Sequence, residues 1–304
     1  MPELYLAAAP YFGWDLVRVV QELFRYAFMQ HAFEAGTIVA LSAGVIGYFV
    51  VLRGLSFAAH ALSHIGFAGA TGAVLVGTAP IVGLLVFTMS AGAVMGALGQ
   101  RLRGRDVTIG LVMAWSLGLG LLFTRLYKGS ANLAIGILFG QIFGITSQDV
   151  AVTFVAGFVT VLLVLAVYRP LLFATLDEEV AEAKGVPVRA LSIAFMVVLA
   201  VAVSEAVQVV GVLLIFALIV APAAIAERFT TRPSRGVLLA MVLAVLFTWA
   251  GLSIAYYLPY PVGFFITTIA FWSYILARVL SGAVARRAAG RVRPWREEQA
   301  RHSP

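Results

Sequence analysis

Residues 55–69 read Leu-Ser-Phe-Ala-Ala-His-Ala-Leu-Ser-His-Ile-Gly-Phe-Ala-Gly, an apolar stretch that holds two of the four histidines of the chain. With its flanks, the stretch is long enough to predict a membrane-spanning helix over residues 57–77. Because side chains four residues apart lie on the same side of a helix, His60 and His64 share one face. Polar side chains are costly at membrane depth, so this pair marks a candidate functional site inside a membrane helix.

The composition of the chain extends this conclusion to the whole protein. Of its 304 residues, 62% are hydrophobic and only 12% are charged, whereas charged residues make up about a quarter of a soluble domain. The apolar runs are long and continuous, which argues against a membrane β-barrel, in which apolar and polar residues alternate. We therefore predict an all-α polytopic membrane protein.

The number of spans follows from the lengths of the apolar runs, because a helix needs about 20 apolar residues to cross a bilayer. The predicted spans are 36–52, 57–77, 79–99, 107–124, 149–168, 188–204, 207–226, 237–257 and 263–280. A short, glycine-rich segment, 132–147, is predicted to be re-entrant or a tenth span. Topologies with nine and with ten spans place basic residues in the cytoplasm equally well. We favour nine, because a tenth would require the basic cluster at 101–105 to be translocated.

The predicted transmembrane domain, residues 32–280, lies between an amphipathic N-terminal segment, residues 1–31, and a basic cytoplasmic tail, residues 281–304. Arg18 and Glu22 interrupt the first apolar run, so this run is unlike a cleavable signal peptide. The net charge of +7 is typical of cytoplasmic loops that contact anionic membrane lipid, and we expect no binding of nucleic acid.

The histidine pair suggests metal chemistry. The chain has no cysteine, which excludes disulfides and thiolate metal ligands. Two imidazoles on one helix face can bind a divalent metal, and Ser63 nearby could orient a ring or supply an oxygen ligand. The alternative is that both histidines are packing residues, with rings bonded to the backbone or to serine. His31 and His302 lie outside the predicted spans. We interpret the pair as the substrate site of a metal transporter.

Two further residues in the spans are candidates for a transport path. Glu205, expected near an external turn between two spans, could attract cations at a pore mouth, or simply lie in interfacial water. Pro222 bends its helix and frees a carbonyl, which could shape a pore wall or be an ordinary kink.

The cytoplasmic segment 174–187 predicts a short helix between two spans. Its acidic residues cluster in the first turns, where the positive end of the helix dipole favours them, and Gly185 and Pro187 suit its end. Such a helix either serves as a solvated connector or docks into a groove of a partner. The candidate docking residues are Asp177, Glu179, Ala181, Glu182, Lys184 and Gly185.

The sequence contains no phosphate-binding loop for ATP. Such a loop requires Gly-Lys-Ser/Thr, and neither Lys128 nor Lys184 follows glycine or precedes serine or threonine. If transport is driven by ATP, hydrolysis therefore takes place on another chain, and we do not expect this one to be an enzyme.

Four stretches in order along residues 30–280 carry a resemblance to a known family. They are 51–57 with 61–64, the basic loop followed by 106–110, 181–189, and 209–214 through to Pro222. Together they resemble the permease subunit of bacterial zinc/manganese/iron ABC importers, the ABC-3 family. Residues 179–185 are also close to the Glu-Ala-Ala-x-x-x-Gly pattern of ABC importer permeases, from which Val180 departs. The usual family pattern Asp-Ala-Leu-Ser-His has histidine in place of aspartate here, at His60, while His64 matches directly.

This resemblance implies a fold like that of vitamin B12 importer permeases, in the bacterial plasma (inner) membrane. It also implies a homodimer of permeases with two cytoplasmic ATPase subunits and an extracytoplasmic metal-binding donor protein. Residues 174–187 would be the coupling helix. His60 and His64 would form a transient site for a transported ion, zinc or manganese, with no permanently bound cofactor. We favour zinc, because two imidazoles suit it and oxygen ligands suit manganese.

Three alternatives differ in their requirements. The permease of a metal-chelate importer, for siderophores or vitamin B12, needs a wide pathway and no metal ligands in the membrane. A secondary carrier needs an intramembrane carboxylate to couple protons, and only Glu205 is available. An intramembrane metallopeptidase needs His-Glu-x-x-His, which residues 60–64 do not match.

Overall fold

The computed structural model describes residues 21–98, 105–127, 132–258 and 260–301, and these contain helices but no strands. In chain order the elements are α3 (Ala27–Leu52), α4 (Ser56–Leu75), α5 (Pro80–Leu98), α6 (Arg105–Leu126), α7 (Asn132–Phe139), the short 3₁₀ helix η1 (Ile142–Gly144), α8 (Ser147–Ala166), α9 (Tyr168–Leu176), α10 (Glu178–Ala183), α11 (Val188–Val210), α12 (Val212–Phe229), α13 (Pro233–Tyr257) and α14 (Val262–Arg301).

The helices confirm the predicted polytopic fold. Eight segments in the described part of the chain are long and apolar enough to cross a membrane, namely α3, α5, α8, α11, α12, α13, residues 106–126 of α6 and residues 262–282 of α14. The ninth predicted span is α4, a helix of 20 residues that packs against α5 and α6 and is buried over most of its length. Its two histidines lower its hydropathy below that of the eight apolar segments. Burial inside the bundle partly shields these polar rings from lipid.

The glycine-rich segment 132–147 does not cross the membrane. It forms α7, of 8 residues, and the short η1. At 1.5 Å per residue, α7 is about 12 Å long, far short of a hydrocarbon core of about 30 Å. The loop after α7 instead lies against the turn between α11 and α12, where a Cβ on either Gly140 or Gly211 would collide with the other's backbone. The re-entrant alternative thus describes this segment better than a tenth span.

Two helix boundaries differ from the predicted ones. The first span begins at Ala27 rather than at residue 36, so it includes His31, whose Nδ1 lies 3.3 Å from the carbonyl oxygen of Ile145. The predicted N-terminal segment 1–31 therefore ends inside α3, and its residues 1–20 lie outside the described part. The turn expected near Glu205 lies instead at Gly211, because Gly211 adopts φ +87°, which ends the helix, while Glu205 continues it.

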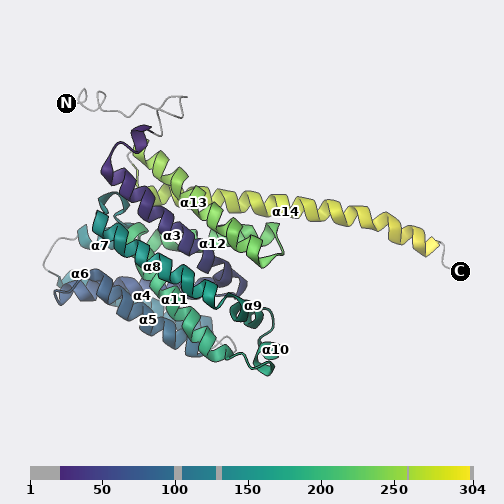
Figure 1. Cartoon of the computed structure of the whole chain (residues 1–304), viewed down its shortest axis with the longest axis horizontal. Helices are drawn as coiled ribbons and strands as arrows, with labels where there is room; N and C mark the ends of the chain where they lie inside the picture. The colour runs from purple at the N-terminus through teal and green to yellow at the C-terminus, as the bar shows by residue number, and fades with distance from the viewer. Residues whose placement is uncertain (1–20, 99–104, 128–131, 259, 302–304) are drawn as a thin grey trace.

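The two ends of the bundle carry different short helices (Figure 1). Helix α7 lies at one end, and α9 and α10 lie at the opposite end. Helix α14 continues past the bundle as one long helix through residues 283–301 of the predicted tail. The basic loop at 101–104 lies outside the described residues. Of the segment predicted as 174–187, residues 178–183 form the separate helix α10.

Helix α4 is held in the bundle by a close crossing with α5. A Cβ on Gly69 would collide with the carbonyl oxygen of Gly83, and a Cβ on Gly83 would collide with that of Gly69. Small residues let membrane helices approach closely and gain dispersion contacts that lipid cannot replace. The crossing therefore fixes α4 against α5 through backbone contact.

Replacing Gly69 by alanine should destabilise the protein, because the added methyl group forces the two backbones apart. Overpacking of this kind costs about 1–3 kcal/mol. We expect a lower midpoint in thermal unfolding of the purified protein in detergent. Gly118→Ala is the matched control, since nothing lies within 4 Å of its Cβ position on α6. Equal midpoints for the two variants would contradict the proposed backbone contact.

Candidate metal site

His60 and His64 are the fifth and ninth residues of α4 and lie on one face of it. The centroids of their rings are 4.6 Å apart, and the ring planes are nearly perpendicular, at 88°. The ring of Phe216 on α12 lies 4.8 Å from that of His60. Both histidines are half-buried. The structure thus brings the two predicted residues together at the boundary between α4 and α12.

One nitrogen atom of each ring lacks the hydrogen bond that a pure packing role would need. The Nδ1 atoms of both rings are buried and have no hydrogen-bond partner in the described structure. Ser63 donates its hydroxyl to the carbonyl oxygen of His60, at 2.7 Å, rather than to either ring. Buried polar atoms are normally satisfied, so unpaired ring nitrogens are candidates to bind an ion or a water molecule. Their lone pairs suit a divalent metal ion.

The pair alone does not complete a coordination sphere. Within the described residues, no group of three or more histidine, cysteine, aspartate or glutamate side chains could hold a metal ion. Zinc usually takes four ligands, and oxygen-preferring divalent ions take six or more. Any further ligands to an ion held at the pair would then be water, backbone, hydroxyl or amide oxygens, residues outside the described part, or groups from another chain. Such an incomplete site suits an ion that binds briefly and leaves.

Glu205 lies apart from the histidine pair. Its side chain is only 5% exposed, and neither carboxylate oxygen has a hydrogen-bond partner among the described residues. The carboxylate lies between α11, α8 and α3, since a Cβ on Gly157 would be 3.1 Å from its Oε1 and 3.3 Å from the hydroxyl oxygen of Ser42. It therefore does not lie in interfacial water. Its predicted contact with cations at a pore mouth stays a prediction.

Pro222 is buried inside α12, and the helix continues through it. Proline has no backbone N–H, so the carbonyl of Leu218 one turn earlier loses its usual partner. Helix α3 packs closely on this part of α12, since a Cβ on Gly47 would collide with the carbonyl oxygen of Ile219. These contacts show that Pro222 belongs to a packed part of the bundle, and its predicted role in a pore wall remains untested.

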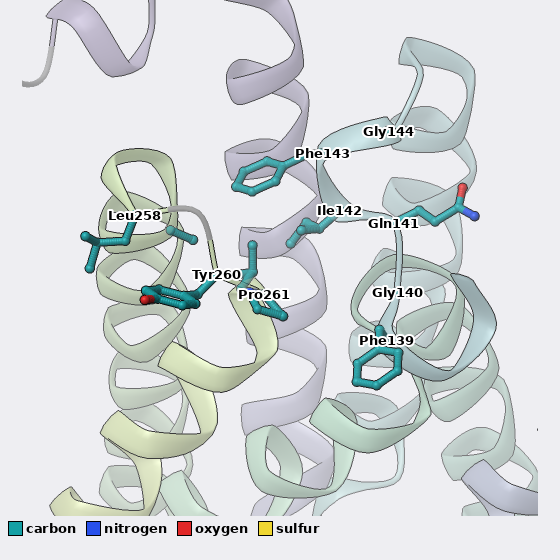
Figure 2. A pocket seen from close by; sticks show the side chains of 11 residues that line it. Phe139, Gly140, Gln141, Ile142, Phe143, Gly144, Leu258, Tyr260 and Pro261 are labelled. Atoms are coloured by element: carbon teal, nitrogen blue, oxygen red, sulfur yellow. The ribbon is translucent and has the colours of Figure 1, made fainter. Parts of the chain in front are cut away.

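Two of the cavities among the described residues open at the α7 end of the bundle, away from the histidines. The larger, of about 670 Å³, lies between the loop around η1 and the turn that joins α13 to α14, as Figure 2 shows. Its lining includes the aromatic side chains of Phe143 and Tyr260. A second cavity, of about 430 Å³, has Gln141, Asp149 and Gln208 in its lining. Neither is lined by His60 or His64.

Helix α10 occupies the predicted docking segment. The carboxylate of Asp177 accepts a hydrogen bond of 2.9 Å from the backbone N–H of Val180, which caps the start of α10. Gly185 ends the segment with φ +85°. Glu179, Glu182 and Lys184 are exposed, as docking requires.

Ala181, one of the candidate docking residues, is fully buried and therefore packs inward rather than facing a partner. Leu176 and Val180 were not predicted as docking residues, but these large apolar side chains are 68% and 44% exposed beside the acidic residues. Two apolar residues four positions apart in an acidic segment were the signal that could have revealed them.

Comparison with known sequences identifies related proteins. The model of a family described as the ABC 3 transport family matches residues 25–281. The manganese transport system membrane protein MntC of Listeria innocua is 31% identical over 238 residues, which cover 78% of this chain and 85% of the relative. The manganese import system permease protein ScaB of Streptococcus parasanguinis is 30% identical over 249 residues, covering 82% and 89%.

Solved structures show the same architecture. A chain of PsaBC from Streptococcus pneumoniae, solved in complex with Fab, superposes with a TM-score of 0.78 at 28% identity and covers 86% of this chain and 95% of its own. An inward-facing putative metal-chelate type ABC transporter superposes with a TM-score of 0.68 at 15% identity, covering 89% and 91%. At 15% identity, this second superposition shows a shared fold and nothing about function.

Removing either imidazole should weaken metal binding by the purified chain, because each variant loses one of two nitrogen ligands. For His60→Ala and His64→Ala we expect at least about ten-fold weaker binding, since even groups behind a metal ligand change affinity by that much. Isothermal titration with Mn²⁺ and Zn²⁺ measures this. Ser63→Ala is the control, because its hydroxyl bonds to the backbone. Unchanged affinity in both histidine variants would remove the pair as a metal site.

Proposed function

The chain belongs to the ABC 3 transport family, and from that premise we propose that it imports manganese through a transient site at His60 and His64. It is a multi-pass permease subunit of a metal importer in the bacterial inner membrane. The observation that supports the proposed site is the pair of facing imidazoles whose Nδ1 atoms are buried without partners.

The proposed cargo rests on the relatives and on coordination chemistry together. The relatives from Listeria innocua and Streptococcus parasanguinis, at 31% and 30% identity, are named as a manganese transport and a manganese import protein. Two imidazoles alone favour zinc, which binds nitrogen ligands more tightly than manganese does. An incomplete site that fills its remaining positions with water provides the oxygen ligands and the higher coordination number that manganese prefers. We therefore propose manganese as the transported ion, in place of the zinc favoured by the sequence analysis.

We propose that three partners complete the transporter. A separate cytoplasmic ATPase docks on α10 and the end of α9, through Val180, Leu176 and the exposed acidic residues around them. An extracytoplasmic donor protein delivers the ion at the α7 end. A second copy of this chain covers the face of α4 that carries Phe57, His60 and His64, which is left half-exposed or exposed in the single chain. ATP-driven closure of the ATPases then displaces α10 and switches the access of the site between the two sides.

The alternative of a metal-chelate importer has less support. This chain shares the fold of a putative metal-chelate type ABC transporter, at 15% identity. A shared fold carries no information about the transported cargo. A chelate presents a large organic surface and needs no bare nitrogen ligands in the membrane. The unpaired histidine nitrogens therefore favour a free ion over a chelate.

Uptake in proteoliposomes tests the proposed function. With the ATPase and donor protein present, His60→Ala and His64→Ala should abolish most manganese uptake while the complex still assembles. His60→Asp should keep transport and shift preference further toward manganese over zinc, because a carboxylate is the harder ligand. The measurement is the uptake rate of each ion, with assembly checked by size-exclusion chromatography. Normal uptake by both alanine variants, or uptake of a chelate but not of free ion, would overturn the proposal.

Charge placed in the exposed apolar part of the docking segment should separate the permease from its ATPase. For Leu176→Glu and Val180→Glu we expect loss of co-purification with the ATPase, because burying an unpaired carboxylate at an apolar contact is costly. Ser234→Glu, at an exposed position of α13, is the matched control and should keep the complex. If both substitutions in the docking segment left the complex intact, the ATPase would have to bind elsewhere.

A further inference from the structure

The turn between α3 and α4 is short and tightly bonded. Arg53 caps α3, because its backbone N–H donates to the carbonyl oxygen of Phe49, at 2.9 Å, and the N–H of Gly54 donates to that of Val51, at 3.0 Å. Gly54 then adopts φ +65°, and Leu55 donates a backbone hydrogen bond of 2.8 Å to Val50. Helix α4 begins at the next residue. Because the turn has no slack, a displacement of Arg53 must displace the start of α4.

The side chain of Arg53 joins two other helices. Its Nη2 donates to the hydroxyl of Ser192 on α11, at 2.7 Å, and its Nη1 donates to the hydroxyl of Thr175 on α9, at 3.5 Å. The guanidinium carbon also lies 5.5 Å from the centre of the Phe195 ring on α11. The planar guanidinium holds fixed directions for each of these contacts, which a lysine could not reproduce.

Aromatic contacts tighten the same junction. The ring of Phe49, one turn before Arg53, lies edge-on to Tyr168 of α9 at 5.7 Å and to Phe195 of α11 at 6.3 Å. Edge-to-face pairs resist relative sliding because their geometry is specific. Helices α3, α9 and α11 therefore meet at one junction, with Arg53 bonded across it.

The junction lies between the docking segment and the metal-binding helix. Thr175 lies two residues before Asp177, and the carboxylate of Asp177 caps α10. On the other side, His60 follows Arg53 by seven residues, across the tight turn and the first turn of α4. The same side chain thus contacts the helix that leads into α10 and belongs to the turn that leads into the histidine pair.

We propose that Arg53 is a positioning residue that transmits displacement of α9 and α10 to α4, and so to the histidine site. The inference rests on the proposed function, in which an ATPase pushes on α10. When α9 moves relative to α11, the guanidinium either carries the α3–α4 turn with it or loses a charged hydrogen bond. Movement of α10 and exposure of the histidines are thereby linked through one side chain.

The first experiment separates coupling from assembly. We expect Arg53→Gln to assemble with the ATPase and to keep its basal ATP hydrolysis. Stimulation of hydrolysis by manganese and the donor protein, and uptake of manganese, should each fall by about ten-fold, within the range of coupling measured between linked sites. Arg53→Lys should give intermediate stimulation and uptake, since lysine keeps the positive charge but lacks the two guanidinium nitrogens that bond to Ser192 and Thr175. Arg235→Gln, at an exposed position of α13, is the control and should behave as wild type.

Two partner variants keep the test valid if Arg53→Gln fails to fold. Ser192→Ala removes only the hydroxyl at 2.7 Å and should lower stimulation, whereas Ser192→Thr keeps a hydroxyl and should restore it. In the double variant, Arg53→Gln with Ser192→Ala should be no worse than Arg53→Gln alone, because both changes break the same bond. Wild-type stimulation in Ser192→Ala would overturn the inference.

A distance measurement tests the transmission directly, and the absence of cysteine from the chain makes labelling specific. Spin labels at Arg169→Cys, an exposed position of α9, and Val76→Cys just beyond α4 should change their separation on addition of ATP in the assembled transporter. With Arg53→Gln added, we expect no change. An equal change in the two backgrounds would overturn the inference. If the wild-type complex imports no manganese, the proposed function fails instead.

Discussion

In a bilayer core, every backbone N–H and C=O must find its partner within the protein, and the architecture of this chain follows from that requirement. The spans are uninterrupted helices because a helix satisfies its own backbone. Where the backbone next to a span is not helical, other parts of the protein pack against it. The turn at Gly211, for example, lies against the backbone of Gly140. The re-entrant α7 and the loop behind it thus shield a turn that could not face lipid. The two glycines are needed because both adopt positive φ where backbones touch.

The same requirement extends from backbone to side chains, and it explains where α4 lies. A helix that carries two imidazoles cannot face hydrocarbon without cost, so it lies within the bundle, against α5 through the contact of Gly69 with Gly83. Close backbone approach leaves α4 little freedom to rotate. The face with His60 and His64 is therefore held toward α12 and the half-exposed boundary of the chain, where water, an ion or another chain can reach the nitrogens.

Apolar run length predicted the spans well, because burial in lipid depends on composition over about 20 residues and hardly on neighbours. The pairing of His60 with His64 was also predictable, since helix periodicity alone sets it. The turn at Gly211 was predicted near Glu205 instead, because a polar residue was taken as the sign of a turn. The positive φ of Gly211 is what ends the helix. The inward direction of Ala181 and the contact of His60 with Phe216 could not be predicted, because each depends on helices distant in sequence.

The contacts of Arg53 could not be predicted from the sequence either, and they matter for the proposed function. Its charge beside a predicted span looks like an ordinary cytoplasmic anchor, the role that positive residues at helix ends usually have. Its bonded partners, Thr175 and Ser192, lie 122 and 139 residues further along the chain. A site with only two protein ligands releases its ion easily, so direction must come from which side the site faces rather than from tight binding. In the proposed mechanism, the bonded connection from the docking segment through Arg53 to α4 is the part of the fold that would give an incomplete metal site its direction.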